Sequence, residues 1–175
     1  ACPTPGACPF MGTANTMCAT AEILGLSPHG NASVRSQTPA WHEMARQAAR
    51  RVVEAVRDEI RPLDIIGQNS FENVVRYMMA TGGSTNSLLH IPAMARQAGC
   101  DITPETFDRL SREVPCISTI YPNHPTYTME EFSAAGGLEA VVKELAAAGK
   151  IDVTAKGMFG TIGDKAAGAV NRNRE

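Results

Sequence analysis

The chain opens with Cys2-Pro-Thr-Pro-Gly-Ala-Cys8-Pro-Phe-Met-Gly12-Thr-Ala-Asn-Thr-Met-Cys18-Ala-Thr20, a proline-rich loop that runs into a helix-forming sequence. Residues 2–12 predict an irregular loop, because proline fixes φ and glycine opens conformations that other residues avoid. From Thr13 onward, alanine, methionine, threonine and leucine predict a helix that ends near Gly25. Cys8 is therefore expected in a stiff loop before a helix N-terminus, where unpaired N–H groups favour thiolate over thiol.

The residues alone leave two interpretations of Cys8 open. A thiolate in such a loop suits a metal cluster. Free cysteine is also among the most buried residue types and often acts as a small apolar group. There is no CxxC pair, and the spacing Cys2-x5-Cys8-x9-Cys18 fits no zinc or ferredoxin pattern. Cys18 lies well inside the predicted helix, and we expect it to pack in the core.

Length and composition exclude several classes of protein. A chain of 175 residues with 43% hydrophobic content is long enough for one domain with a core. The net charge of −2 gives no basic surface for nucleic acid. No run approaches the roughly 20 apolar residues that span a bilayer, and no signal peptide is expected. Five cysteines at irregular spacings predict no disulfide framework, so a reducing cytoplasm is the expected compartment.

Helical periodicity dominates the rest of the chain. The clearest pattern predicts a helix over residues 38–60 with one buried stripe, formed by Trp41, Met44, Ala48, Val52 and Val56. Further helices are predicted after Ser70, Ser84, Thr103 and Thr128, and short strands over residues 116–120 and 151–154.

The sequence Gly82-Gly-Ser-Thr-Asn86 permits two interpretations. As structure, it is a helix stop followed by a helix cap; as chemistry, it is an anion seat before a helix N-terminus. We favour the structural interpretation. His90, four residues later, is expected to be a partly buried histidine with a hydrogen-bond partner.

Several blocks of the chain, in the same order, resemble one family of enzymes. The first is Pro5-Gly-Ala-Cys8-Pro-Phe-Met-Gly-Thr-Ala-Asn-Thr-Met17, followed by Ala21-Glu-Ile-Leu-Gly-Leu26 and Gly30-Asn-Ala-Ser33. The later blocks are Gly82-Gly-Ser-Thr-Asn86 with Leu89-His90, Ala95-Arg-Gln-Ala-Gly99, Thr128-Met-Glu-Glu-Phe132 with Ala135-Gly-Gly-Leu138, and, more loosely, Val153-Thr-Ala-Lys-Gly157. They resemble the dihydroxy-acid and sugar-acid dehydratases, which include the 6-phosphogluconate dehydratases. The wording Cys8-Pro-Phe-Met-Gly12 is most similar to the xylonate dehydratase-like branch.

This resemblance implies a cytoplasmic, homo-oligomeric hydro-lyase that converts a 2,3-dihydroxy or sugar acid into a 2-keto-3-deoxy acid. The family uses an iron–sulfur cluster, [2Fe–2S] or [4Fe–4S], together with Mg²⁺. Three cysteines hold the cluster, and the third lies in a motif that matches the loop around Cys8. Cys8 is thus the expected metal ligand. By sequence adjacency, the other expected cofactor-binding residues are Met11, Gly12, Thr13 and Asn15.

The chain lacks two further motifs of that family. It contains no Cys-Asp-Lys and no Asp-Gly-Arg-Phe-Ser-Gly-type sequence with the family's catalytic serine, so no catalytic residue is assigned. The chain therefore resembles a middle section of a longer enzyme. The implied fold class is α/β, as the helix-rich part of a three-layer α/β/α N-terminal dehydratase domain. Residues 1–175 would form a single domain or domain fragment, with a cluster-loop segment at 1–25 and a helical body at 38–170. The alternative is a non-catalytic helical fragment or assembly module that lacks the remaining cluster ligands and the catalytic base.

Overall fold

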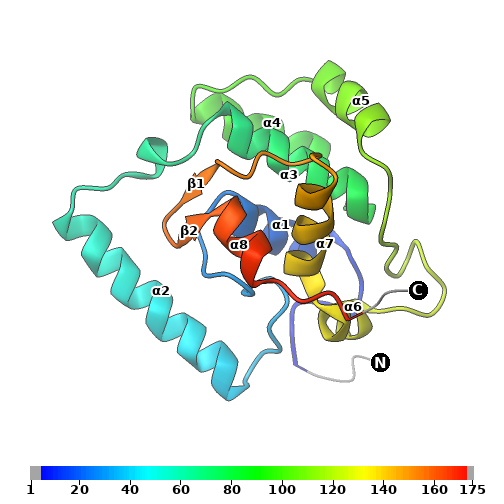
Figure 1. Cartoon of the computed structure of the whole chain (residues 1–175), viewed down its shortest axis with the longest axis horizontal. Coiled ribbons are helices and arrows are strands. Elements are labelled where there is room, and N and C mark those ends of the chain that lie inside the picture. Colours follow the sequence, from blue (N-terminus) through cyan, green and yellow to red (C-terminus); the bar gives the residue numbers. More distant parts are fainter. Residues whose placement is uncertain (1–4, 173–175) are drawn as a thin grey trace.

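A computed structural model describes residues 5–172 and shows a mostly helical molecule (Figure 1). Cys2 lies outside the described residues. In chain order the elements are α1 (Thr13–Ile23), α2 (Pro39–Arg57), the 3₁₀ helix η1 (Pro62–Asp64), α3 (Gln68–Thr81), α4 (Ser87–Gln97), α5 (Pro104–Glu113), α6 (Met129–Ala135), α7 (Gly137–Ala147), β1 (Lys156–Gly157), β2 (Gly160–Thr161) and α8 (Ile162–Gly168).

The expected three-layer α/β arrangement is not what the described residues form. Their sheet is one antiparallel pair of two-residue strands, β1 and β2. Residues 116–120 are not a strand, because the N–H groups of Ile117 and Ser118 both donate to the carbonyl of Ala80, at 2.9 and 3.0 Å. β-Branched residues favour extended backbone, but a strand also needs a neighbouring strand to bond with. The strand expected over residues 151–154 is a turn, in which Asp152 N–H donates to Asn73 Oδ1 at 2.8 Å.

Several helix boundaries follow the capping chemistry of the sequence. The Thr38 hydroxyl accepts from Trp41 N–H, and the Thr128 hydroxyl accepts from Glu130 N–H, as expected of N-cap residues. Thr103 precedes α5 with a capping box. α4 begins after Asn86 and not after Ser84, where the sequence predicted its start. It contains Pro92, as the sequence indicated.

α3 lies at the centre of the hydrophobic core. Its inner face carries Phe71, Val74, Val75 and Met78, each at most 3% exposed, and α1, α5 and α7 pack against it. Burial of such side chains is the main source of stability for a domain of this size. The core continues through α7 onto α8, so the last helix of the chain is packed against the same body.

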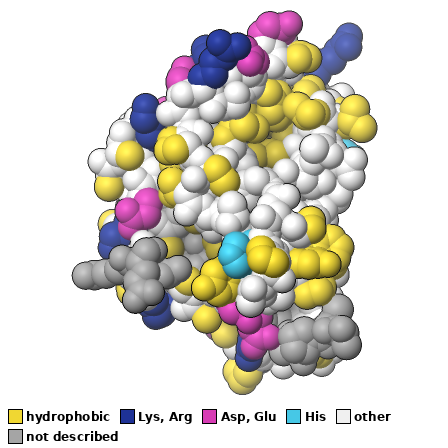
Figure 2. All heavy atoms as spheres, turned by 90° about the vertical axis from the view of Figure 1, so that its right-hand side faces the viewer, with side chains coloured by type: hydrophobic (Ala, Val, Ile, Leu, Met, Phe, Trp, Pro, Cys, Tyr) yellow, Lys and Arg dark blue, Asp and Glu magenta, His cyan; other side chains and the backbone are white. Residues whose placement is uncertain are grey.

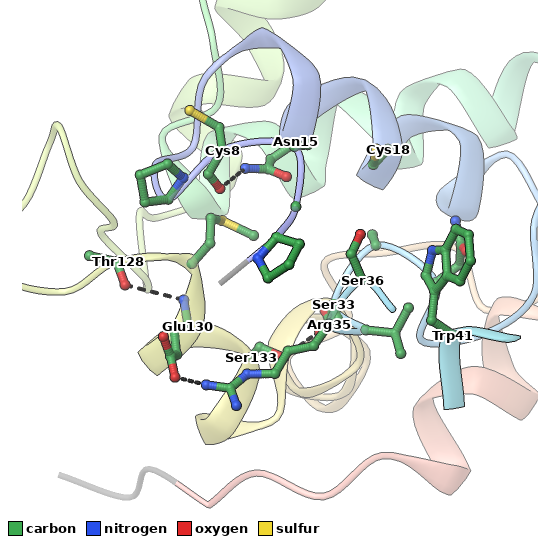
Figure 3. A pocket seen from close by; sticks show the side chains of 18 residues that line it. Cys8, Asn15, Cys18, Ser33, Arg35, Ser36, Trp41, Thr128, Glu130 and Ser133 are labelled. Atoms are coloured by element: carbon green, nitrogen blue, oxygen red, sulfur yellow. Dashed lines mark hydrogen bonds and ion pairs between the residues drawn. The ribbon is translucent and has the colours of Figure 1, made fainter. Parts of the chain in front are cut away.

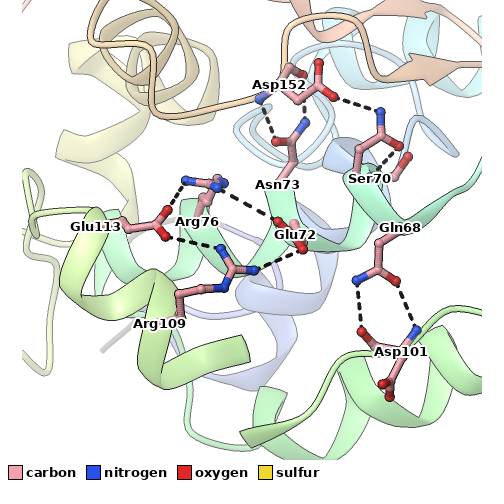
Figure 4. Close-up of polar contacts among 10 residues, drawn as sticks. Gln68, Ser70, Glu72, Asn73, Arg76, Asp101, Arg109, Glu113 and Asp152 are labelled. Atoms are coloured by element: carbon pink, nitrogen blue, oxygen red, sulfur yellow. Dashed lines mark hydrogen bonds and ion pairs between the residues drawn. The ribbon is translucent and has the colours of Figure 1, made fainter. Parts of the chain in front are cut away.

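Polar side chains of α3 bond to neighbouring segments of the chain (Figure 4). Arg76 and Arg109 bond to Glu113 at 3.0 and 3.2 Å, and Arg109 also bonds to Glu72 at 3.1 Å, which links α3 to α5. Asn73 is fully buried and exchanges two hydrogen bonds of 2.8 Å with the backbone of Asp152. α3 is therefore held on both its apolar and its polar sides.

α2 differs from the sequence-based prediction. It stands at the edge of the molecule (Figure 1), and Ala55 is its only buried residue. Trp41, Val52 and Val56 are 38%, 57% and 75% exposed, so the expected buried stripe is wrong. Periodicity correctly indicates an amphipathic helix, but the other described residues provide no surface that covers this side of it.

The β1–β2 hairpin is docked on the end of α1, as Figure 1 shows. Met158 N–H donates to the carbonyl of Gly25 at 2.8 Å. A Cβ at Gly25, which has φ +74°, would lie 2.2 Å from Gly157 Cα, so only glycine permits this approach. Arg51 Nε donates to the Met158 carbonyl at 2.6 Å, so the same hairpin provides a contact for α2.

Residues 115–128 run over the face shown in Figure 2 without forming a helix or strand. Hydrophobic side chains form separate groups on this face, and charged side chains lie toward its rim. Exposed apolar residues of the segment are Ile117, Tyr121 and Tyr127, and His124 stacks on Tyr127 with ring centroids 4.4 Å apart. Among residues 5–172, no helix has both the length and the apolar character that crossing a membrane requires.

Candidate functional site

The loop that carries Cys8 has its backbone fixed from two sides. The Asn15 amide of α1 donates to the carbonyls of Cys8 and Phe10, each at 2.9 Å. Met129 N–H, at the start of α6, donates to the carbonyl of Pro9 at 2.8 Å. Three successive carbonyls are thus engaged, and Asn15 itself is only 7% exposed. The thiol of Cys8 is presented from a backbone that has little freedom to move.

A pocket of about 200 Å³ lies beside this loop (Figure 3). One wall comes from residues 5–9 together with Asn15 and Cys18 of α1. The opposite wall comes from residues 31–36, with Trp41 at the start of α2, and from Thr128 and the first turn of α6. Figure 3 shows the Cys8 sulfur pointing away from the Asn15 amide. A small polar molecule fits a space of this size and lining.

The structure brings together only some of the expected cofactor-binding residues. Cys8 and Asn15 line the pocket, whereas Met11, Gly12 and Thr13 are not among its lining residues. Met11 is 3% exposed and belongs to the hydrophobic core. Gly12 is the N-cap residue of α1. The Thr13 hydroxyl lies 3.1 Å from Ser84 Oγ and accepts from the Asn86 amide at 2.7 Å.

Those contacts explain the sequence Gly82-Gly-Ser-Thr-Asn86. Gly82 ends α3 with φ +62°, and Ser84 N–H donates to the Thr16 hydroxyl at 3.0 Å. The segment joins the end of α3 to the first turn of α1, which supports its structural interpretation. His90 is exposed on α4 rather than partly buried. Its expected side-chain burial is therefore wrong.

Cys18 also lines the pocket, although the sequence indicated core packing. Its side chain is only partly buried. Burial, assisted by the negative charge of Glu22, raises the pKa of the Cys18 thiol above its usual value. This shift favours the neutral thiol over the thiolate that binds metals.

A buried ion pair behind the pocket was not indicated by any sequence pattern. Glu22 and Lys165, from α1 and α8, have side chains that are at most 1% exposed, and their charged atoms are 2.6 Å apart. The Glu22 carboxylate also accepts from Gly30 N–H at 2.9 Å and from Ala32 N–H at 2.7 Å. This pair therefore fixes the start of the loop that forms the opposite wall of the pocket. The residues are 143 positions apart, so no local periodicity could connect them.

The charges of this pair act on two neighbouring groups. Burial, followed by the Coulombic effect of Glu22, raises the pKa of Glu139. The pKa of His29 is lowered, chiefly by burial and next by the positive charge of Lys165. Both shifts favour the neutral form of the side chain.

The donor atoms of the described residues fit one ligand position of a metal cluster and not a complete site. Within residues 5–172, no three His, Cys, Asp or Glu side chains are grouped so that they could hold a metal ion. Cluster iron in proteins takes thiolate ligands, about three or four of them for one cluster. Cys8, half-buried on a fixed backbone beside a pocket, is suited to supply one.

Comparison with known proteins identifies the family. Residues 1–165 match the model of the dihydroxy-acid/6-phosphogluconate dehydratase N-terminal region. The chain belongs to this family. It is 42% identical over 152 residues to a dihydroxy-acid dehydratase of Hydrogenobaculum sp. (strain Y04AAS1), which covers 87% of this chain and 27% of the relative. It is 38% identical over 176 residues to the dihydroxy-acid dehydratase of Moorella thermoacetica, which covers 100% of this chain and 32% of the relative.

A third relative, the dihydroxy-acid dehydratase of Roseiflexus castenholzii, is 37% identical over 175 residues, covering 97% of this chain and 30% of the relative. The chain thus spans less than a third of the length of these relatives. All three are named dihydroxy-acid dehydratases, so the comparisons do not support the xylonate-like branch.

Proposed function

We propose that this chain is the segment of an iron–sulfur dehydratase that supplies one cluster thiolate, Cys8, and one wall of the substrate pocket. The observation that carries the proposal is the clamped Cys8 loop beside that pocket, in a chain that belongs to a dehydratase family. The remaining cluster ligands, the base and the Mg²⁺ site would come from regions that these 175 residues do not contain.

The reaction is the loss of water from an acid with hydroxyls at C2 and C3, giving a 2-keto-3-deoxy acid. A cluster bound by Cys8 and by ligands outside these residues would supply Lewis-acid chemistry for the departing hydroxyl. The chain's own residues position the loop that carries the cluster ligand. Asn15 holds the carbonyls of Cys8 and Phe10, so the backbone that carries the thiolate would stay in place when the cluster is bound.

The substrate is a small hydroxy acid of one of two classes. The names of the relatives favour a 2,3-dihydroxy acid. The sequence Cys8-Pro-Phe-Met-Gly12 favours an aldonate, as in the xylonate-like proteins. Comparing the turnover rates of one preparation on an acid of each class decides between them.

The test uses two cysteine variants in a protein of the relatives' full length that carries this segment. We expect Cys8→Ser to abolish dehydration of the acid that the parent turns over, because the serine oxygen does not replace a cluster thiolate. Cys18→Ala should keep most of the turnover, because Cys18 lies within α1 and not on the loop that Asn15 holds. Full turnover in Cys8→Ser would contradict the proposal.

The second candidate is a non-catalytic assembly module. It is favoured by the absence of a grouped metal-ligand set within residues 5–172 and by the exposed apolar side of α2. It predicts equal turnover for the two cysteine variants.

A further inference from the structure

The pocket contains a single positively charged side chain among the described residues that line it. That side chain is Arg35, from the wall formed by residues 31–36. Its guanidinium reaches across to the carboxylate of Glu130, in the first turn of α6 (Figure 3). Both partners remain accessible to solvent, with side-chain exposures of 50% and 34%.

The backbone that leads to Arg35 is anchored, although its side chain is not enclosed. Glu22 holds Gly30 and Ala32 as described, the Ser33 carbonyl accepts from Ser133 Oγ, and Ser33 Oγ accepts from Leu138 N–H at 3.1 Å. The Arg35 carbonyl itself accepts from the Thr38 hydroxyl at 2.8 Å. The guanidinium can thus exchange partners while the wall of the pocket stays in place.

The energetics favour such an exchange. A partly exposed ion pair contributes only about 0–1 kcal/mol, because both charges remain well hydrated. If Glu130 lost its contact with Arg35, the cost in free energy would therefore be small, because its side chain is 34% exposed and water can hydrate the carboxylate. A ligand carboxylate can accept two parallel hydrogen bonds from the guanidinium, and the ligand's hydroxyl groups can in addition bond to other polar side chains of the lining.

We infer that Arg35 binds the carboxylate of the acid substrate, and that Glu130 is an internal competitor that occupies Arg35 when no ligand is bound. The inference rests on the proposed function for its choice of ligand, a 2,3-dihydroxy acid. Other polar side chains of the same lining, such as Asn31 and Ser36, are available to the hydroxyl groups. Arg35 is a specificity-determining residue in this arrangement, and Glu130 sets how readily it accepts a ligand.

The test is an NMR titration of the 175-residue chain with glycerate, the simplest 2,3-dihydroxy acid, and with the neutral glyceramide. We expect saturable shifts of the amides of residues 31–36 with glycerate and none with glyceramide. Arg35→Gln should weaken glycerate binding about threefold or more, because the cation that contacts the carboxylate is lost from a half-exposed position. Arg35→Lys, which keeps the charge without the two-point geometry, should give an intermediate loss.

Two further variants separate ligand binding from a structural role. Glu130→Gln removes the competitor and should tighten glycerate binding by about threefold or more. Arg112→Gln, which breaks an exposed pair with Asp108 on α5, should leave the affinity unchanged and serves as the matched control. Thermal melting of each variant checks that it is folded.

Three results would overturn the inference. They are the absence of saturable glycerate binding, an affinity unaffected by Arg35→Gln, and a Glu130→Gln variant that binds as weakly as Arg35→Gln. The titration needs no cluster, so its failure leaves the cysteine test of the proposed function intact. Likewise, the outcome of the Cys8→Ser test does not affect the interpretation of the glycerate titration.

Discussion

The helices α2 and α3 have similar sequence patterns and different surroundings. Each is an amphipathic helix, with apolar residues recurring at helical spacing. Nine of the 14 residues of α3 are buried, whereas only Ala55 is buried among the 19 residues of α2. α3 packs against α1, α5 and α7, and its polar side chains bond to α5 and to the turn around Asp152 (Figure 4).

The difference shows which features of a helix its apolar periodicity can predict. An apolar stripe specifies a helix and the side of it that prefers to leave water. It does not specify that a covering surface lies within the same 175 residues. Val75 on α3 is covered by other helices and is 0% exposed, whereas Val52 on α2 is 57% exposed.

The largest expected effect comes from placing the same charge on each helix. Val75→Asp should cost about 4 kcal/mol or more, because an unpaired carboxylate would enter the core. Val52→Asp should change the stability of this chain by no more than about 0.5 kcal/mol, since Val52 is 57% exposed. Urea unfolding of the two variants measures both values. A Val52→Asp variant as unstable as Val75→Asp would mean that α2 is packed as α3 is.

Ion pairs allow the same contrast between buried and exposed parts of the molecule. Lys165→Met should cost about 3 kcal/mol, because it leaves the Glu22 carboxylate buried without its cation. Glu22→Ala should cost more, since it also leaves Gly30 N–H and Ala32 N–H without an acceptor. Arg46→Gln breaks an exposed pair with Glu43 on α2 and should cost less than about 1 kcal/mol. Equal losses for Lys165→Met and Arg46→Gln in chemical denaturation would refute this ranking.

Local chemistry made part of this molecule predictable. The caps at Thr38, Thr103 and Thr128 and the proline within α4 follow from rules that involve only a few neighbouring residues. The two expected strands failed because a strand depends on a distant neighbour, which residues 116–120 lack.

The candidate site divides in the same way. The proline loop and the helix after it were predicted, but the clamp by Asn15, the Arg35–Glu130 pair and the Glu22–Lys165 pair were not. These contacts join segments far apart in the chain or depend on the path of an irregular loop. Sequence adjacency proposed Met11 and Thr13 as neighbours of the cofactor, and the fold directs them to the core and to Ser84 instead.

The smallest expected effect is a pH dependence at His29. Its pKa is lowered in the folded state, so the unfolded state binds the proton more readily. Its contribution to stability is therefore fully present above the ordinary histidine pKa of about 6.5 and is lost as the pH falls below that value. We expect His29→Gln to lose less stability than the parent between about pH 6.5 and pH 5. Denaturant titrations of both proteins at several pH values measure the two slopes, and parallel slopes would contradict the assignment.

The iron content of the full-length protein tests the central claim most directly. Cys8 and Cys18 line one pocket, but Cys8 lies on the loop whose carbonyls bond to Asn15 and Met129, whereas Cys18 lies within α1. We predict that anaerobically purified Cys8→Ser retains less than about a tenth of the parent's iron per chain, whereas Cys18→Ala retains most of it. Iron at the parent's level in Cys8→Ser would show that Cys8 is not a cluster ligand.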